Sequence, residues 1–417
     1  MIVAVIGLGY IGLPTAALIA SKGVKVVGVD VNHHVVSIIN QGKIHIIEPD
    51  LDILVQSSVQ SGNLRATTET EKADVFIVAV PTPLQGNHEP DLSYIKSAAK
   101  AIAPVLGKGN LVILESTSPV GTTEKLKEWM SEERPDLSFP EFGISSKVDV
   151  SVAHCPERVL PGNVVRELVE NDRIIGGLTT RCAKKSSEFY NTFIKADCLL
   201  TDSRTAELSK LVENSFRDVN IAFANELSLI CDKLNLNVWE LIKFANHHPR
   251  VNILQPGPGV GGHCIAVDPW FIVDSAPDEA KLIKLARLVN DEKPYFVIKK
   301  VNQAVSNISK DVSELSIACL GLSFKPDIDD LRESPALKIA KQVSEMGFKK
   351  HYIVEPNIKD LPDEFNSQFT ELVELEKALV STDILLLLVD HLPFKEINLS
   401  FLSGKQVIDT RGTLVGI

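Results

Sequence analysis

Residues 1–30 read MIVAVIGLGYIGLPTAALIASKGVKVVGVD, and this stretch decides the fold of the first part of the chain. Two apolar runs flank three glycines and a helical pattern, which predicts the order strand, glycine turn, helix, strand. Gly7, Gly9 and Gly12 have the spacing G-x-G-x-x-G, which allows a tight turn, close approach of a pyrophosphate to the backbone, and packing of the helix on the strand. The stretch therefore predicts a dinucleotide-binding α/β unit.

Asp30 ends the second predicted strand of this unit. An acid at that place accepts hydrogen bonds from a ribose diol and repels a 2′-phosphate, so the expected cofactor is NAD rather than NADP. Tyr10 and Ile11 lie inside the glycine turn and are expected to contact the cofactor as well. A coincidental turn is disfavoured because the two strands and the acid accompany the glycines.

Composition limits the classes of protein to consider. The chain has 417 residues, of which 44% are hydrophobic and 23% charged, as in a globular protein of two or three domains. A formal net charge of −11 argues against a general binder of nucleic acid or anionic membranes. Six cysteines without a C-x-x-C pair suggest neither a disulfide framework nor a zinc ribbon, and fit a reducing cytoplasm. No run of ~18 apolar residues predicts a membrane span, and no metal site is expected.

Two further apolar strand runs end in threonine-containing segments, VPTP (80–83) and ESTSPVG (115–121). In an open parallel sheet, ligands lie beyond the carboxyl ends of the strands, where Thr82 and Thr117 are expected. Both threonines are therefore candidate cofactor contacts. A cap or turn role remains the alternative for each, and for Thr82 the two interpretations are equally good.

A long helix is predicted within 203–248, because this span lacks Gly and Pro and its apolar residues recur at helical spacing, with a second helix opening at Asn237. Lys210, Asn214 and Arg217 project from one face of the long helix. They are interleaved with the apolar positions rather than opposite them. This favours a polar wall facing a cleft over a solvated stripe.

The loop PGPGVGGHCIAVDPW (256–270) follows these helices and delivers one cysteine, Cys264, beside His263 and ahead of Asp268. Its glycines let a substrate lie against the backbone and let bare N–H groups face a developing negative charge. A thiol in such a place is a candidate nucleophile. The loop by itself fits a tight turn with a buried structural cysteine equally well.

A second α/β pattern begins near residue 316, after a helical stretch over 278–307 that Pro294 is expected to interrupt. Ser334 and Pro335 are the expected N-cap and first residue of its first helix. The predicted fold class is α/β, with two Rossmann-like domains around a helical middle and boundaries at 1–200, 201–310 and 311–417.

Two loops hold further charged candidates. Glu157 and Arg158 lie in AHCPERVLPG, and Lys325 and Arg332 in GLSFKPDIDDLRESPA. Lys325 and Arg332 could meet phosphate or carboxylate. The simpler alternatives are an exposed ion pair for the first two and an ordinary exposed loop for the others.

Six motifs in one order resemble the UDP-glucose/GDP-mannose dehydrogenase family along essentially the whole chain. They are VIGLGYIGLP (5–14), ESTSPVG (115–121), CPERVLPG (155–162), the helix with Lys210 and Asn214, GVGGHCIAVD (259–268) and GLSFKPDIDDLRESP (321–335). The resemblance implies a four-electron oxidation, in which a primary alcohol on a UDP-sugar becomes a carboxylate through two NAD used in sequence. Cys264 would add to the intermediate aldehyde as a thiohemiacetal and then carry a thioester that water cleaves.

The resemblance also implies roles for individual residues. Lys210 and Asn214 would hold a water or stabilise the oxyanion, Asp268 would orient this group, and Glu157 and Thr117 would activate or position water. The UDP-sugar would contact Lys210 and Asn214, and in addition Arg158, Val159, Arg217, His248, Arg250, Gly261, Phe324, Lys325 and Arg411.

Two arginines match family positions outside the chemistry. Arg250 matches an arginine that reaches the neighbouring subunit's site, which implies a homodimer formed by the helical middle. Arg332 matches a cofactor-side contact. The C-terminal α/β domain would bind the UDP-sugar.

The run HPRVNILQPGPGVGGHCIAVDPWFIV (248–273) resembles the members that act on UDP-N-acetylmannosamine, whereas members for UDP-glucose typically carry Leu-Pro-Lys-Asp where 265–268 read IAVD. The acidic amino sugar would serve a surface polysaccharide such as enterobacterial common antigen. Three alternatives stay open: a UDP-N-acetylglucosamine 6-dehydrogenase, a nucleotide-sugar-binding protein without catalysis, and a single-step hydroxyacid dehydrogenase, which would need neither the thiol nor the second α/β domain.

Overall fold

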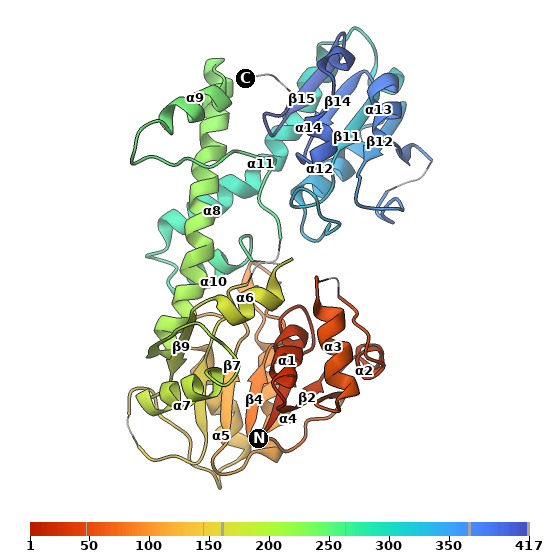
Figure 1. Cartoon of the computed structure of the whole chain (residues 1–417). Helices are drawn as coiled ribbons and strands as arrows, with labels where there is room; N and C mark the ends of the chain where they lie inside the picture. Colours follow the sequence, from red (N-terminus) through yellow and green to blue (C-terminus); the bar gives the residue numbers. More distant parts are fainter. Residues whose placement is uncertain (47, 145, 160–161, 263, 366–367, 415–417) are drawn as a thin grey trace. The chain divides into compact units, whose positions relative to one another are not determined.

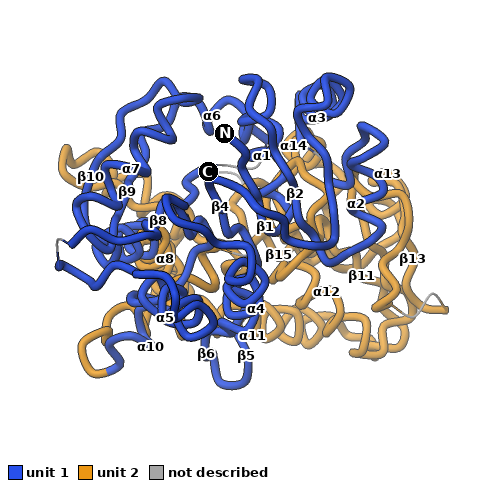
Figure 2. Tube along the Cα trace, turned by 90° about the horizontal axis from the view of Figure 1, so that it is seen from below, with its two compact units in different colours: residues 1–213, 270–277 blue, residues 214–269, 278–417 orange. Residues whose placement is uncertain are grey.

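The computed structural model describes the chain except residues 47, 145, 160–161, 263, 366–367 and 415–417. The chain forms two compact units, residues 1–213 with 270–277, and residues 214–269 with 278–417 (Figures 1 and 2). Helix α8 (Ser203–Leu234) contributes to both units. His263, expected beside the nucleophile, lies outside the described residues.

The first unit is built on an eight-stranded sheet in the order β10-β9-β8-β7-β4-β1-β2-β3. All neighbours pair in parallel except β8 and β9, which pair antiparallel. The strands are β1 (Ile2–Ile6), β2 (Lys25–Val29), β3 (Leu64–Thr67), β4 (Val75–Val78), β7 (Leu111–Leu114), β8 (Ser151–His154), β9 (Arg173–Gly177) and β10 (Cys198–Asp202). The order reverses between β1 and β4, which is the switch point where doubly wound sheets bind ligands.

Helices cover both faces of this sheet and bury two apolar cores. One core includes α1 (Gly12–Ser21), α2 (His33–Asn40), α3 (Leu51–Gln60), α6 (Val164–Glu170) and α7 (Thr180–Tyr190). The other includes α4 (Ser93–Ile102) and α5 (Thr122–Glu133). The strands of a parallel sheet are buried on both faces, which is why β1, β4 and β7 are continuous apolar runs. A small hairpin pairs β5 (Leu84–Gln85) with β6 (Glu89–Pro90).

The second unit combines helices with a five-stranded parallel sheet in the order β13-β12-β11-β14-β15. The strands are β11 (Ser316–Leu320), β12 (Lys350–Val354), β13 (Thr370–Leu372), β14 (Ile384–Leu387) and β15 (Gln406–Asp409). The helices are the second part of α8, α9 (Val238–Ala245), α11 (Lys281–Ser306), α12 (Pro335–Ser344), α13 (Leu375–Ser381) and α14 (Leu392–Lys395). Helix α10 (Asp268–Ser275) again contributes to both units.

The predicted fold class, with Rossmann-like sheets at both ends of the chain, is confirmed, and so are two helix starts. The side chain of Ser334 accepts a hydrogen bond from Leu337 N at the start of α12, and Pro335 is the first helical residue. Asn237 likewise caps α9. These signals are local, so the sequence alone is enough to place them.

The expected interruption at Pro294 is wrong, because α11 continues through this residue. A proline inside a helix costs about 3 kcal/mol. Two contacts with α8 just before Pro294 offset this cost: Asn290 Nδ2 donates to Asp218 Oδ1 at 2.8 Å, and Lys293 Nζ donates to Ser228 Oγ at 2.6 Å. Tertiary contacts with α8 thus override the local preference.

Candidate active site

The glycine turn after β1 is shaped for a phosphate-bearing ligand. Gly7 has φ +91°, and its N–H donates to Val29 O at 2.8 Å. A Cβ at Gly12 would lie 1.8 Å from Gly7 O, whereas a Cβ at Gly9 would meet nothing within 4 Å. Gly7 and Gly12 are therefore required by the turn itself, and Gly9 leaves open the space through which a pyrophosphate approaches the helix N-terminus.

Asp30 also has a structural role that the sequence does not indicate. Its Oδ2 accepts a hydrogen bond from Leu8 N at 3.0 Å, and its Oδ1 accepts one from Asn32 N at 2.9 Å. The carboxylate is thus fixed beside the glycine turn and remains partly exposed. Tyr10, in the same turn, is 41% exposed. These residues fit NAD. Backbone N–H groups already hold the Asp30 carboxylate in place in the unliganded protein.

Thr82 and Thr117 follow two neighbouring strands, β4 and β7, and the structure brings them together. The hydroxyl of Thr82 donates to the carbonyl of Thr117 at 2.5 Å. Both residues lie after the carboxyl ends of their strands, on the side of the sheet where the glycine turn lies.

Glu157 is not part of an exposed pair with Arg158. Its carboxylate is buried and accepts from Arg173 Nη1 at 2.8 Å and from the backbone N–H of Arg158 at 2.6 Å. The side chain of Arg158 instead pairs with Glu213 at 2.7 Å. Arg173 was not predicted, because it lies on β9 and meets Glu157 only through the fold. Val159 packs against the apolar core beside this cluster.

Two buried acids were also missed. Burial raises the pKa of Glu115 to about 7, although the charge of Arg173 opposes the rise, and Tyr190 Oη donates to its carboxylate at 2.6 Å. Burial raises the pKa of Glu207 to about 7 too. Glu207 accepts from the backbone N–H groups of Gly121 and Thr123 at 2.7 and 2.8 Å. Glu207 lies one helical turn before Lys210 on α8, and this spacing was the one sequence signal that could have marked it as a candidate.

The cysteine loop joins three candidate catalytic residues within the second unit. The carbonyl of Cys264 accepts from Asp268 N at 2.9 Å, where α10 begins. The carboxylate of Asp268 accepts from Asn214 Nδ2 at 2.6 Å, and both side chains are buried. Cys264 itself is exposed, whereas four of the other cysteines are buried. The alternative of a buried structural cysteine is therefore wrong.

The side chains of Lys210, Asn214 and Arg217 do not share one environment. Asn214 is buried against Asp268, Lys210 is partly exposed, and Arg217 is exposed. The spacing i, i+4 and i+7 returns to nearly the same angle at about 100° per residue, so the three positions do share one helix face, and a polar wall along this face stays a prediction.

The loop that carries Cys264 lies against the segment between β11 and α12. A Cβ at Gly261 would lie 2.5 Å from Glu333 O and 3.1 Å from Phe324 Cβ. A Cβ at Gly257 would lie 2.7 Å from Arg411 Nη1. The fold thus brings Phe324 and Arg411 to the cysteine loop. Glycine is required at 261, where a Cβ would meet the backbone, whereas at 257 a Cβ would meet only the end of the flexible Arg411 side chain.

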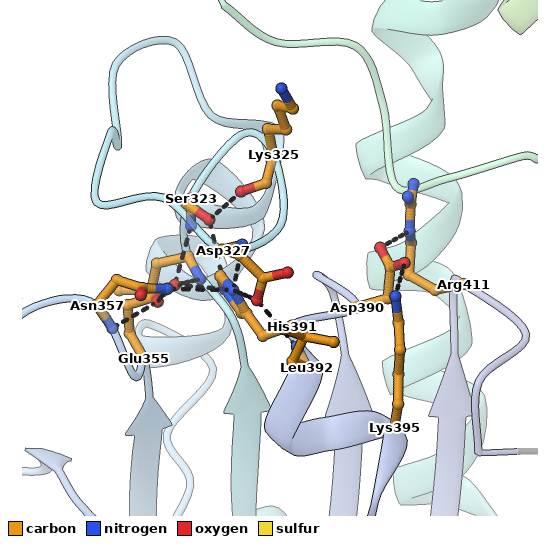
Figure 3. A network of polar contacts seen from close by, with 11 residues as sticks. Ser323, Lys325, Asp327, Glu355, Asn357, Asp390, His391, Leu392, Lys395 and Arg411 are labelled. Atoms are coloured by element: carbon orange, nitrogen blue, oxygen red, sulfur yellow. Dashed lines mark hydrogen bonds and ion pairs between the residues drawn. The ribbon is translucent and has the colours of Figure 1, made fainter. Parts of the chain in front are cut away.

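Arg411 also borders a cavity of about 550 Å³ in the second unit. The cavity is lined by Trp239, Lys243, Asn246, His247, Gln255, Arg411 and Gly412. Asp390 fixes the guanidinium of Arg411 at 2.8 Å and the ammonium of Lys395 at 3.3 Å (Figure 3). The indole of Trp239 and the cationic groups of Lys243 and Arg411 line the space, which suits a base and phosphates.

The remaining predicted residues lie on the surface. Lys325, Arg332, His248 and Arg250 are exposed. Arg332 makes a two-pronged ion pair with Asp330, at 2.9 and 2.6 Å. Among the described residues no helix is long and apolar enough to cross a membrane, and no group of ligating side chains suits a metal ion.

Together, the two Rossmann-like sheets, the glycine turn with its acid and the glycine loop with an exposed thiol define a dinucleotide-dependent enzyme. Comparison with known proteins gives the family. The NAD-binding, central and UDP-binding domains of the UDP-glucose/GDP-mannose dehydrogenase family match residues 1–194, 204–292 and 318–415. The chain belongs to this family, and the expected NAD-dependent nucleotide-sugar dehydrogenase class is confirmed.

Several relatives are similar over nearly the full length. A UDP-N-acetyl-D-mannosamine dehydrogenase of Campylobacter jejuni is 62% identical over 95% of this chain and 96% of the relative. An NDP-N-acetyl-D-galactosaminuronic acid dehydrogenase of Ralstonia nicotianae is 59% identical over 98% of this chain and 95% of the relative. The solved structure of a UDP-D-ManNAc dehydrogenase from Pyrococcus horikoshii covers 99% of this chain and 96% of its own, with a TM-score of 0.87 and 40% identity.

Proposed function

We propose that the protein oxidises the C6 alcohol of UDP-N-acetylmannosamine to the carboxylate in two steps. The exposed thiol of Cys264, at the end of a glycine loop, is the observation that carries this proposal. NAD, when bound, accepts a hydride in each step. The names of the relatives support an N-acetylated hexosamine as the sugar.

Cys264 acts in the second step. Its thiolate adds to the aldehyde carbon and forms a C–S bond, and loss of a hydride from the thiohemiacetal gives a thioester on sulfur. Water then attacks the thioester carbonyl and gives up its protons, the C–S bond breaks, the uronate leaves, and Cys264 is again a thiolate. Asn214, held by Asp268, is the donor that can stabilise the oxyanion of this attack, together with Lys210 one helical turn earlier.

Glu157 and Thr117 are the residues that we assign to water in the first unit. Glu157 is oriented by Arg173 and by a backbone N–H. A carboxylate held by two donors can accept a proton from water only when water reaches its remaining lone pairs.

The UDP moiety fits the second unit. We assign the cavity bordered by Trp239, Lys243 and Arg411 to the nucleotide, because a flat ring and cations are the groups that recognise a base and a diphosphate. Phe324 and Lys325 would contact the remaining part of the UDP-sugar, and Gly261 the sugar itself. Val159, Arg158, Arg217 and His248 complete the expected contacts.

The substrate is tested by NADH release with a panel of UDP-sugars. UDP-N-acetylmannosamine should give the highest kcat/KM, and UDP-glucose should be a poor substrate. The panel must contain UDP-N-acetylgalactosamine and UDP-N-acetylglucosamine, because the Ralstonia relative is named for the former sugar type and the latter is an epimer. Higher kcat/KM with either one would change the sugar and keep the mechanism. Comparable turnover with NADP would contradict the role of Asp30.

We also infer a homodimer formed through the helical middle of the chain, with residues 201–310 as the dimerisation domain. Phe216, Phe223 and Ile230 recur every seven residues on α8 and are 68%, 53% and 46% exposed. On α11, Leu282 and Tyr295 are 66% and 68% exposed. A second copy of the chain would cover this apolar face, as exposed apolar stripes on helices indicate association. The enzyme would act in the cytoplasm and supply an acidic sugar for a surface polysaccharide.

Sharing of active sites across the dimer is tested by mixing two inactive variants. Arg250→Ala and Cys264→Ala chains should regain up to about a quarter of wild-type activity after subunit exchange, because a hybrid dimer holds one site with an intact thiol and an intact partner arginine. Each variant alone is the control. Exchange shown by mass spectrometry without any recovered activity would place Arg250 in its own subunit's site.

A further inference from the structure

The second unit repeats the backbone of the cofactor turn. Gly321, after β11, has φ +91°, the same value as Gly7 after β1. The N–H of Gly321 donates to Val354 O at 2.8 Å, and that of Gly7 donates to Val29 O at 2.8 Å. Each glycine thus leaves its strand with the same turn and bonds to the end of the neighbouring strand.

The acid that follows the second strand is repeated as well. Leu8 N donates to Asp30 at 3.0 Å in the first unit, and Leu322 N donates to Glu355 at 2.7 Å in the second. Glu355 therefore occupies in its own sheet the place that Asp30 occupies in the NAD-binding sheet.

The two acids differ in what else they meet. Asp30 is partly exposed, whereas Glu355 is 4% exposed and lies 3.0 Å from Nε2 of His391. Figure 3 shows Glu355, His391 and Asn357 gathered beside the loop after β11. The carboxylate of Glu355 already accepts hydrogen bonds from an imidazole and from backbone N–H groups, so it has no lone pair left for a ribose diol. We therefore do not expect this sheet to bind a dinucleotide as the first one does.

The hydrogen bonds fix the tautomer of His391. The backbone N–H of Asp327 lies 2.9 Å from Nδ1 and can only donate, so Nδ1 is the acceptor. In the neutral ring the proton is then on Nε2 and is donated to Glu355. The imidazole is thus a bridge between the end of β12 and the loop 322–331.

The bridge holds a loop of unusual conformation. Asp327 has φ +61°, which is uncommon for a residue other than glycine, and its Oδ1 accepts from Leu392 N at 2.9 Å. Within the loop, Ser323 Oγ donates to Lys325 O at 2.7 Å (Figure 3) and Phe324 N donates to Asp330 O at 3.2 Å. Phe324 and Lys325 in this loop are residues that we expect to contact the UDP-sugar.

We propose that His391 is a positioning residue for UDP-sugar binding. By accepting a hydrogen bond from the N–H of Asp327, His391 fixes the loop 322–331 in the conformation that presents Phe324 and Lys325. By donating to Glu355, it occupies a carboxylate whose counterpart in the first unit, Asp30, remains partly exposed. The part that concerns UDP rests on the proposed function, whereas the part that concerns the loop does not.

Two substitutions separate the two hydrogen bonds. In His391→Asn the side-chain oxygen replaces the Nδ1 acceptor, and in His391→Gln the side-chain NH₂ replaces the Nε2 donor. If the loop depends on the acceptor, UDP affinity measured by calorimetry should fall about tenfold in His391→Gln, the effect of a backbone N–H left without its partner, and much less in His391→Asn. NAD affinity should stay unchanged in both variants.

Hydrogen exchange of the unliganded protein provides a readout without ligand. Amides in 322–331 should exchange faster in His391→Gln than in wild type, with near wild-type exchange in His391→Asn. His351→Gln is the control, because His351 is a buried histidine of the same sheet that contacts Thr370 and Cys319 rather than the loop. It should alter neither exchange in 322–331 nor UDP affinity.

The proposal would be overturned if the two His391 variants had the same amide exchange in 322–331 and the same UDP affinity. A larger loss of UDP affinity in His391→Asn than in His391→Gln would overturn it too. A wild-type protein that binds no UDP would refute the proposed function, while the exchange of 322–331 would still decide the role of His391.

Discussion

Cys264→Ala is expected to bind NAD and UDP normally and to form almost no uronate, with a loss of acid formation on the order of 10³-fold or more. The thiol is dispensable for the first hydride transfer, and it is required if the second proceeds through a thioester. Binding should persist because the groups assigned to it, the glycine turn after β1 and the cavity at Arg411, do not include the thiol. Wild-type enzyme should release two NADH for each uronate formed.

The adduct can be observed directly. Wild-type enzyme quenched during turnover should carry the mass of the substrate sugar nucleotide on the peptide that contains Cys264. Cys198→Ala is the matched control, since Cys198 on β10 is the other cysteine that is not fully buried, and it should retain activity. Uronate formation by Cys264→Ala at near the wild-type rate would mean that the second oxidation uses the aldehyde hydrate.

The features that could be predicted from the sequence are those set by neighbouring residues. The spacing of Gly7, Gly9 and Gly12 predicts the turn because a Cβ at either end would collide with the backbone. Ser334 and Asn237 predict helix starts because a cap bonds to an N–H two or three residues later. The exposed thiol could not be predicted in the same way, since the burial of Cys264 depends on the whole fold, although the resemblance to a family suggested its role.

The partners of the site residues could not be predicted, because they come from distant parts of the chain. Glu157 meets Arg173 from another strand, and Glu207 bonds to the first turn of α5 through Thr123, which lies 84 residues earlier in the chain. No local pattern encodes these pairs. For the same reason the sequence predicted a break at Pro294, where contacts with α8 keep the helix continuous.

One buried polar network connects the long helices to the cysteine loop. Arg287 Nη1 donates to Asp218 at 2.6 Å, and Asn290 joins Asp218 to Asn225. Asn225 in turn accepts from the backbone N–H of Gly257, at 2.9 Å, where the loop begins. A chain of side chains between α11 and α8 thus ends on the segment that carries Cys264, so the stability of this network bears on the position of the loop.

Arg287→Met is therefore expected to lower the free energy of unfolding of the second unit by about 3–5 kcal/mol, the cost of leaving one charge of a buried pair without its partner. Arg287 and Asp218 are 1% and 0% exposed. Burial raises the pKa of Asp218, and the guanidinium opposes that rise. Urea unfolding followed by tryptophan fluorescence and by hydrogen exchange of α8 measures the change.

Two further variants show whether the charge is the cause. Arg166→Met removes an ion pair whose side chains are 76% and 57% exposed, and it should leave the unfolding free energy almost unchanged. Arg287→Met combined with Asp218→Leu removes both buried charges and should recover most of the loss, since a buried pair and an apolar pair differ little. A double variant as unstable as Arg287→Met alone would assign the loss to packing of the long arginine side chain. If Arg287→Met were no less stable than Arg166→Met, Asp218 would have to be protonated or hydrated in the folded chain. The buried charge pair would then not be what stabilises the network that ends at Gly257.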